Sequence, residues 1–200
     1  KALGEWELLS QAADEQWERG RGNLEFQARV APFAAGAAHN IRDWKLLEKY
    51  LNAIPLNDED GNFYRAISCV SRGNWDDARN FIIAARAQAD VEMTALVAES
   101  YMRAYSAAVR LQQLVELEEI ISVRMLESSP ATASAASVLR EAVLNRWTKR
   151  FVNMAHQPDF MRRVLGVRAL LFSPVEQASS WLLYASVCAR SGRMRSSRRA

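Results

Sequence analysis

Arginine residues crowd the last third of this 200-residue sequence, and they are its strongest candidates for chemistry. Residues 134–200 contain 12 Lys or Arg and three Asp or Glu, a net charge of +9, whereas residues 1–133 carry a net charge of −6. A guanidinium group forms paired hydrogen bonds with carboxylates and phosphates. The pattern indicates either an anionic partner for residues 134–200 or an acidic surface of the same, larger protein.

Two pairs of arginines are candidates for binding one polyphosphate. Arg162 and Arg163 share a predicted helix, and Arg190 and Arg193 flank the turn before the last predicted helix. Two adjacent helix hairpins would bring these groups together around the anion. Nucleic acid is the competing anion, but no aromatic residues interleave with the arginines for base stacking, and no groove-reading motif is present. We therefore expect no nucleic-acid partner.

No pattern of catalytic or metal-binding residues stands out. The sequence has no Gly-rich phosphate loop, no G-x-S-x-G and no kinase catalytic loop. His39 and His156 are far apart, and neither has a His or Cys at metal-ligand spacing. Residues 58–61 lack the third acid and the closing Glu of a calcium loop, so they indicate an exposed turn that begins a helix. The acids of residues 116–119 form either a solvated helix face or a set of interhelix salt bridges. We predict no catalytic residues in this chain.

No segment is predicted to enter a membrane or to direct export. Uncharged apolar stretches such as residues 31–38 are less than half the length of a spanning helix, and no signal-peptide pattern is present. Cys69 and Cys188 make no disulfide framework and are predicted to lie in helix interiors, which favours a reducing, cytoplasmic compartment. The sequence starts at Lys1 without Met, and both ends interrupt patterned sequence. These features predict a segment of a longer chain.

The hydrophobic period is helical almost throughout. Apolar residues recur at steps of three and four, as in Trp6-Leu9-Ala13-Trp17, and sustained alternation of period two is absent. Gly, Pro and Ser clusters interrupt the pattern about ten times, which predicts an all-α fold with about ten helices. Pro32 marks either the first turn of a helix around residues 30–38 or a kink in it. A weak internal division is predicted near residues 128–133.

A repeat suggests how these helices stack. Trp6, Trp44 and Trp75 each follow a small or polar turn and begin a predicted helix, at spacings of 38 and 31 residues. These spacings bracket the roughly 34-residue period of tetratricopeptide repeats. The segment Gly73-Asn74-Trp75-x-x-Ala78 suits the second helix of such a repeat, with residues 63–72 as the first. The pattern predicts an α-solenoid of stacked helix hairpins, tetratricopeptide- or HEAT-like. A free-standing peptide-binding adaptor of this type is one functional alternative, and a polyanion-binding helical module is another.

Specific segments resemble the target-of-rapamycin (TOR) kinase family. Four motifs occur in the same order as in that family: A-I-P, D-G-N-F-Y-R-A, E-M-T-A-L-V-A-E-S-Y and E-L-E-E. The matching segments are residues 2–6, 53–55, 60–66, 92–101, 103–105, 116–119, 168–170, 173–174, 181–186 and 191–193. Residues 128–160 match least. The resemblance covers nearly the whole chain and identifies it as part of the FAT region, the helical solenoid before the rapamycin-binding and kinase domains.

The resemblance implies a scaffold role. A FAT solenoid clamps the kinase domain of its own chain and offers surfaces to TOR complex subunits. The parent would be an ATP-binding serine/threonine protein kinase in dimeric TORC1 or TORC2 assemblies for nutrient signalling. It would be cytoplasmic, or peripheral at vacuolar, lysosomal or other endomembranes, and this segment would carry none of its catalytic residues.

The resemblance also implies a basic pocket for inositol hexakisphosphate. Arg190 stands where the family has a Lys, so that charge is kept. Leu183 replaces another Lys, and His156 stands where an Arg is usual. We expect Arg162, Arg163 and Arg193 to compensate for the lost charges, with Arg190 and His156 completing the site.

Overall fold

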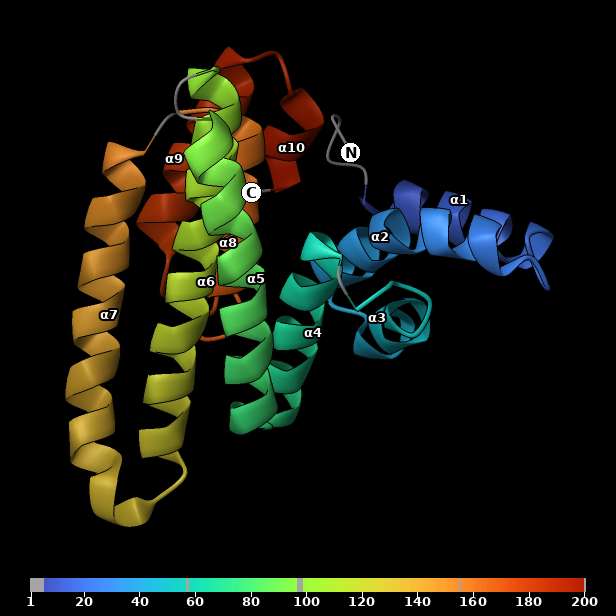
Figure 1. Ribbon diagram of the computed structural model, residues 1–200. Helices are drawn as coiled ribbons and strands as arrows, with labels where there is room; N and C mark the ends of the chain where they lie inside the picture. Colours follow the sequence, from blue (N-terminus) through green and yellow to red (C-terminus); the bar gives the residue numbers. More distant parts are fainter. Residues whose placement is uncertain (1–5, 57, 97–98, 155, 200) are drawn as a thin grey trace. The chain divides into compact units, whose positions relative to one another are not determined.

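The described part of the chain is entirely helical. The computed structural model describes residues 6–56, 58–96, 99–154 and 156–199, and no strand occurs within these ranges. This confirms the predicted all-α fold of stacked helix pairs (Figure 1). The chain divides into two compact units, Lys1–Ser100 and Tyr101–Ala200. The division therefore lies at residue 100, and not near residues 128–133, where the sequence suggested one.

The described residues of the first unit form five helices, and each packs against the next. They are α1 (Trp6–Arg19), α2 (Leu24–Ile41), α3 (Trp44–Leu51), α4 (Glu59–Arg72) and α5 (Trp75–Leu96). Trp44 and Trp75 are the first residues of α3 and α5, as the repeat predicts. Gly73 ends α4 with a φ of 75°, a conformation that glycine adopts without strain, so the turn before Trp75 requires this residue.

Short polar side chains begin three of these helices. Asn23, Asp43 and Asp58 each accept a hydrogen bond from a backbone N–H three residues later. For Asp58 the donor is the amide of Gly61, at 2.6 Å. This bond satisfies one of the unpaired amides of the helix start. Residues 58–61 thus begin a helix, as the sequence predicts, but the prediction of an exposed turn is wrong: Asp58 and Asp60 are half-buried and Gly61 is buried.

Small residues form much of the core of the first unit. Five alanines of α2 are completely buried, namely Ala31, Ala34, Ala35, Ala37 and Ala38. Pro32 lies inside this helix and not in its first turn. His39 is also buried, with its ring 5.9 Å from that of Tyr64 and 6.5 Å from that of Phe63. His39 therefore belongs to an aromatic cluster in the core.

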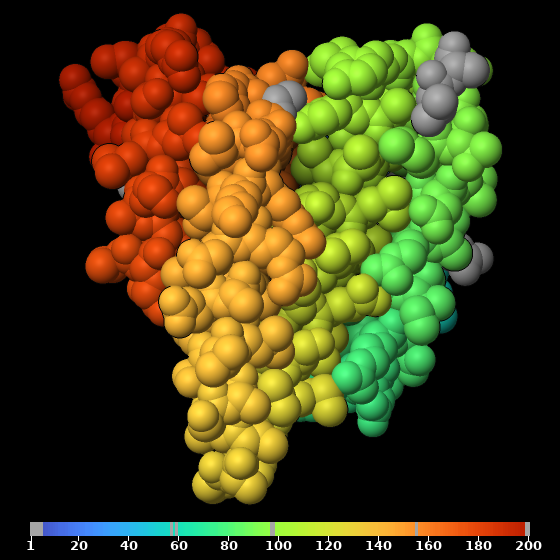
Figure 2. All heavy atoms as spheres, turned by 90° about the vertical axis from the view of Figure 1, so that its left-hand side faces the viewer, coloured from blue at the N-terminus to red at the C-terminus, as the bar shows by residue number. Residues whose placement is uncertain are grey.

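The second unit begins with a hairpin of two long helices. Its elements are α6 (Tyr101–Glu127), the short 3₁₀ helix η1 (Pro130–Thr132), α7 (Ala133–Asn153), α8 (Pro158–Arg168), α9 (Ala178–Arg190) and α10 (Met194–Arg199). Figure 2 shows α6 and α7 side by side down to the turn at residues 128–133. Thr132 Oγ1 donates a 2.6 Å hydrogen bond to the carbonyl of Leu126. The predicted boundary is therefore a tight turn inside one unit.

The core of the second unit joins α6, α7, α8 and α9. One hydrophobic cluster of this core contains the buried residues Val109, Phe151, Met161, Val164, Leu165, Tyr184, Val187 and Cys188. Cys69 of the first unit is likewise buried, and burial raises the pKa of its thiol. Both cysteines are core residues, as the sequence predicts. No helix in the described ranges is long and apolar enough to span a membrane.

A network of polar contacts anchors the turn between α8 and α9. Glu176 accepts hydrogen bonds from the backbone amide of Ser173 at 2.8 Å and from Nη2 of Arg140 at 2.7 Å. The hydrogen bond from Arg140 and those from Ser173 lower the pKa of Glu176 to about 2. The Arg140 guanidinium also lies 4.5 Å from the centre of the Phe172 ring. One α7 arginine thus attaches α7 to the turn before α9.

Candidate functional site

A buried ion pair connects α6 and α8. Arg168 donates from Nε to Oε2 of Glu116 at 2.8 Å and from Nη2 to Oε1 at 2.6 Å. The two side chains are 1% and 0% exposed. Gln112 donates a third hydrogen bond to Glu116, at 2.9 Å. The Arg168 guanidinium also lies 5.2 Å from the ring centres of both Trp147 and Phe151. Such paired, hydrogen-bonded burial is what allows a charge to remain inside a protein.

A second carboxylate connects α6 and α7. Glu119 accepts hydrogen bonds from Arg146 Nη1 at 2.7 Å, from Arg150 Nη1 at 3.0 Å and from the indole Nε1 of Trp147. The acids of residues 116–119 were predicted to be either a solvated face or interhelix salt bridges. Glu116 and Glu119 make interhelix salt bridges.

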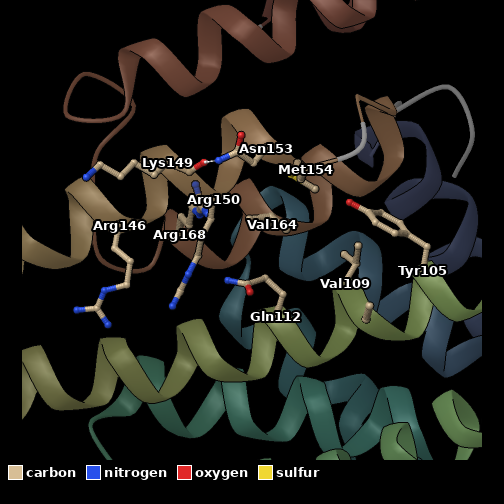
Figure 3. Close-up of a pocket in the computed structure, with 11 residues that line it drawn as sticks. Tyr105, Val109, Gln112, Arg146, Lys149, Arg150, Asn153, Met154, Val164 and Arg168 are labelled. Carbon is tan, nitrogen blue, oxygen red and sulfur yellow. Dashed lines mark hydrogen bonds between the residues drawn. The ribbon is translucent and has the colours of Figure 1, made fainter.

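Beside these ion pairs lies a cavity of about 460 Å³, lined by residues of α6, α7 and α8. Figure 3 shows Arg146, Lys149 and Arg150 grouped at one end, and Tyr105 and Met154 at the other. The basic group has the spacing i, i+3, i+4, which places its members on one face of a helix. None of the five residues predicted as a site lines this cavity. In the sequence, the spacing of Arg146, Lys149 and Arg150 is the pattern that could have indicated this basic end of the cavity.

Two of the predicted site residues approach the same tyrosine. Arg193 makes a two-pronged ion pair with Asp159, at 2.7 and 2.9 Å, and this pairing raises the pKa of Arg193. The Arg162 guanidinium lies 5.4 Å from the centre of the Trp181 ring. Burial is the main cause that raises the pKa of Tyr184, and the positive charges of Arg162 and Arg193 oppose it. Arg162 and Arg193 thus lie at one end of the α8–α9 pair.

The other three predicted residues make separate contacts. Arg163 donates from Nη1 to Ser106 Oγ of α6 at 2.9 Å. Arg190 is exposed and contacts Ser186 of its own helix at 3.4 Å. The ring of exposed His156 lies 3.2 Å from the backbone carbonyl of Val152. Arg163, Arg190 and His156 thus contact residues of three different helices, α6, α9 and α7.

Comparison with known proteins decides the family of the chain. A family model of the FAT domain matches residues 31–200. The chain belongs to the FAT domain family. It is 34% identical over 192 residues to the serine/threonine-protein kinase mTor of Drosophila melanogaster. It is 38% identical over 193 residues to the serine/threonine-protein kinase TOR2 of Saccharomyces cerevisiae, and 35% identical over 210 residues to the serine/threonine-protein kinase TOR of Arabidopsis thaliana.

Each of these alignments covers 96% of the chain but only 7% or 8% of the relative. The resemblance to TOR kinases inferred from the sequence is therefore confirmed over nearly the whole chain. The matched family is the FAT domain and not a kinase domain. This agrees with the prediction that the segment is a noncatalytic part of a kinase.

Several charged residues of this FAT-domain chain hold helices together. Among the described residues, no group of three or more His, Cys, Asp or Glu side chains is placed to hold a metal ion. Glu116 and Glu119 of α6 instead pair with arginines of α8 and α7, and Glu176 of the turn before α9 pairs with Arg140 of α7. This arrangement fixes the geometry of the second unit, and it leaves a cavity with a basic end.

Proposed function

We propose that this chain is a noncatalytic scaffold segment of a TOR-type serine/threonine protein kinase. In this proposal, its helices clamp the kinase domain of the same chain and offer surfaces to complex subunits in nutrient signalling. The observation that carries it is the match of the FAT family model to residues 31–200 of a chain whose helices are joined by ion pairs such as Arg168–Glu116. The FAT family match favours this reading over a free-standing peptide-binding adaptor.

Membership of dimeric TORC1 or TORC2 assemblies is part of the same proposal. So is a cytoplasmic location, with the parent peripheral at vacuolar, lysosomal or other endomembranes. The names of the relatives support the kinase class of the parent, because several are called serine/threonine-protein kinases.

A scaffold role predicts that disruption of the second unit impairs a kinase whose catalytic residues are untouched. We expect Arg168→Ala in the full-length protein to lower kinase activity at least about fivefold and to reduce the amount of co-purified subunits, since it leaves Glu116 buried and unpaired. Immunoprecipitation followed by a kinase assay measures both quantities. Glu141→Ala, at an exposed position of α7, is the matched control.

Normal activity and normal subunit recovery in Arg168→Ala would refute the scaffold role, provided that hydrogen exchange shows α6 and α8 to be disordered in that variant. Loss of both quantities in Glu141→Ala as well would show that the assay does not depend on the buried pair. In that case the proposal also fails.

Binding of inositol hexakisphosphate stays a prediction. Supporting it, Arg190 is exposed, and Arg162 and Arg193 both lie near Tyr184. Against it, Asp159 already binds Arg193, and Leu183 packs against the hydrophobic core of the unit. The described residues therefore fit a polyphosphate only in part, and a phosphate would have to compete with Asp159 for Arg193.

Charge reversal at Arg190 tests this site. We expect Arg190→Glu to weaken binding of inositol hexakisphosphate to the full-length protein at least about tenfold, because it replaces an attraction to phosphate by a repulsion. Isothermal titration calorimetry at low salt measures the affinity, with Lys45→Glu, at an exposed position of the first unit, as a control charge reversal outside the predicted site. Equal affinities of wild type and Arg190→Glu would remove Arg190 from the site.

A further inference from the structure

The cavity between α6, α7 and α8 has two chemically different ends. Arg146, Lys149 and Arg150 lie at one end, and Val109 and Met154 lie toward the other (Figure 3). Its volume of about 460 Å³ is within the range of sites for small organic molecules, which is about 300–1,000 Å³. Such sites combine apolar walls with a few polar groups that orient the ligand. The cavity has both components.

The basic end has more positive charge than its acidic neighbours neutralise. Four cationic residues line the cavity, and they are Arg146, Lys149, Arg150 and Arg168. Among the residues that the structure describes, Glu116 and Glu119 are the acids that pair with them, which leaves an excess of two positive charges. Within the described ranges, the ammonium of exposed Lys149 makes no ion pair or hydrogen bond. This end therefore suits an anion.

The arginines at this end also keep donors for a ligand. A guanidinium carries five N–H donors. Arg146 and Arg150 each direct a single N–H at Glu119 in the part of the chain that the structure describes. Because Glu119 fixes one edge of both side chains, a ligand would meet cations that are already oriented, which lowers the entropy cost of binding. Arg168, by contrast, is 1% exposed and directs two N–H groups at Glu116, so it forms part of the cavity wall.

We propose that this cavity binds a small amphipathic monoanion, an acyl or aryl carboxylate. Its carboxylate would contact Lys149 and Arg146, and its chain or ring would lie against Val109 and Met154. A polyphosphate suits the cavity less well, because the net excess is two charges and the far end is apolar. A folded protein partner would need about 800 Å² of surface on each side, more than a cavity of this size offers. The site is separate from Arg190 and from the proposed scaffold role.

The test compares a charged and a neutral probe of equal length. Ligand-observed ¹⁹F NMR with 8-fluorooctanoate and 8-fluorooctanol on the full-length protein suits a large complex, because the bound ligand broadens strongly. We expect Lys149→Gln to weaken octanoate binding by about threefold to fivefold, as for an exposed ion pair. Lys149→Glu should weaken it at least about tenfold. Binding of the octanol should not change in either variant.

A second variant tests the apolar end. Ala108 also lines the cavity, so Ala108→Met places a longer side chain there. We expect this change to lower binding of both probes at least about tenfold. Arg190 is a cation of the same unit that does not line the cavity. Arg190→Gln should therefore change the binding of neither probe.

Three results would overturn the proposal: no octanoate binding, equal responses of octanoate and octanol to Lys149→Glu, or octanoate binding that survives both Lys149→Glu and Ala108→Met. Lys149 is exposed, so its variants remain informative if Ala108→Met fails to fold. A loss of kinase activity in Arg168→Ala would not bear on this outcome, so the two proposals can fail independently.

Discussion

Glu116→Ala is expected to destabilise the second unit by about 3–5 kcal/mol, because it leaves the Arg168 guanidinium buried without its partner. Both side chains are essentially inaccessible to water, and the carboxylate takes two of the arginine's N–H groups. An uncompensated charge in such a site has no solvent to replace the lost bonds. Amide hydrogen exchange of α6 and α8 in the full-length protein measures the loss as reduced protection.

A double variant separates charge burial from loss of volume. Glu116→Leu with Arg168→Met replaces the pair with apolar side chains of similar size, and we expect a stability close to wild type. Glu141→Ala on the exposed face of α7 controls for a lost carboxylate and should change stability by less than about 0.5 kcal/mol. A Glu116→Ala protein that loses less than about 1 kcal/mol would contradict the assignment of a buried, mutually dependent pair.

The fold was predictable where local patterns determine it. Steps of three and four among apolar residues identify the helices, and a tryptophan at a helix start marks the repeat. Trp44 and Trp75 begin α3 and α5, and the positive φ of Gly73 explains the turn before Trp75. These features depend on interactions within a few residues of each other, which a sequence displays directly.

The buried ion pair beside the cavity was less predictable, because its two residues are far apart in the sequence. Arg168 lies in a basic segment, and guanidinium groups are normally exposed, so its sequence neighbours do not indicate burial. Its partner Glu116 is 52 residues away. Likewise, residues 128–133 contain strong turn signals, yet they join two helices that pack together. A break in the helical pattern shows where a helix ends, whereas a unit boundary depends on which helices pack.

The predicted and observed basic residues differ for the same reason. Arg162 and Arg163 are adjacent in sequence, so their side chains point in different directions around α8. One contacts Trp181 of α9 and the other contacts Ser106 of α6. Arg146 and Arg150 are four residues apart and meet at Glu119. Helical spacing, and not density of charge along the sequence, decides which cations act together.

Trp147→Ala is expected to destabilise the second unit by about 3–5 kcal/mol, the usual effect of removing a large buried aromatic side chain. Trp147 is 1% exposed, and its ring meets that of Phe172 edge-on, with centroids 5.4 Å apart. The Arg168 guanidinium lies over the same ring, and Glu119 accepts the indole N–H. The substitution therefore leaves a cavity and also removes one wall of the buried ion pair. Loss of hydrogen-exchange protection in α7 and α8 measures the effect.

Trp147→Phe distinguishes packing from hydrogen bonding at this position. Phenylalanine keeps an aromatic ring near Arg168 but has no N–H for Glu119, so we expect a loss of about 1–2 kcal/mol. Val152→Ala, at an exposed position of the same helix, controls for a shortened side chain and should lose less than about 0.5 kcal/mol. If Trp147→Phe were as unstable as Trp147→Ala, the indole N–H would outweigh the ring. Glu119 would then be the principal support of α7, and Glu119→Leu, which removes the acceptor, should reproduce most of the loss.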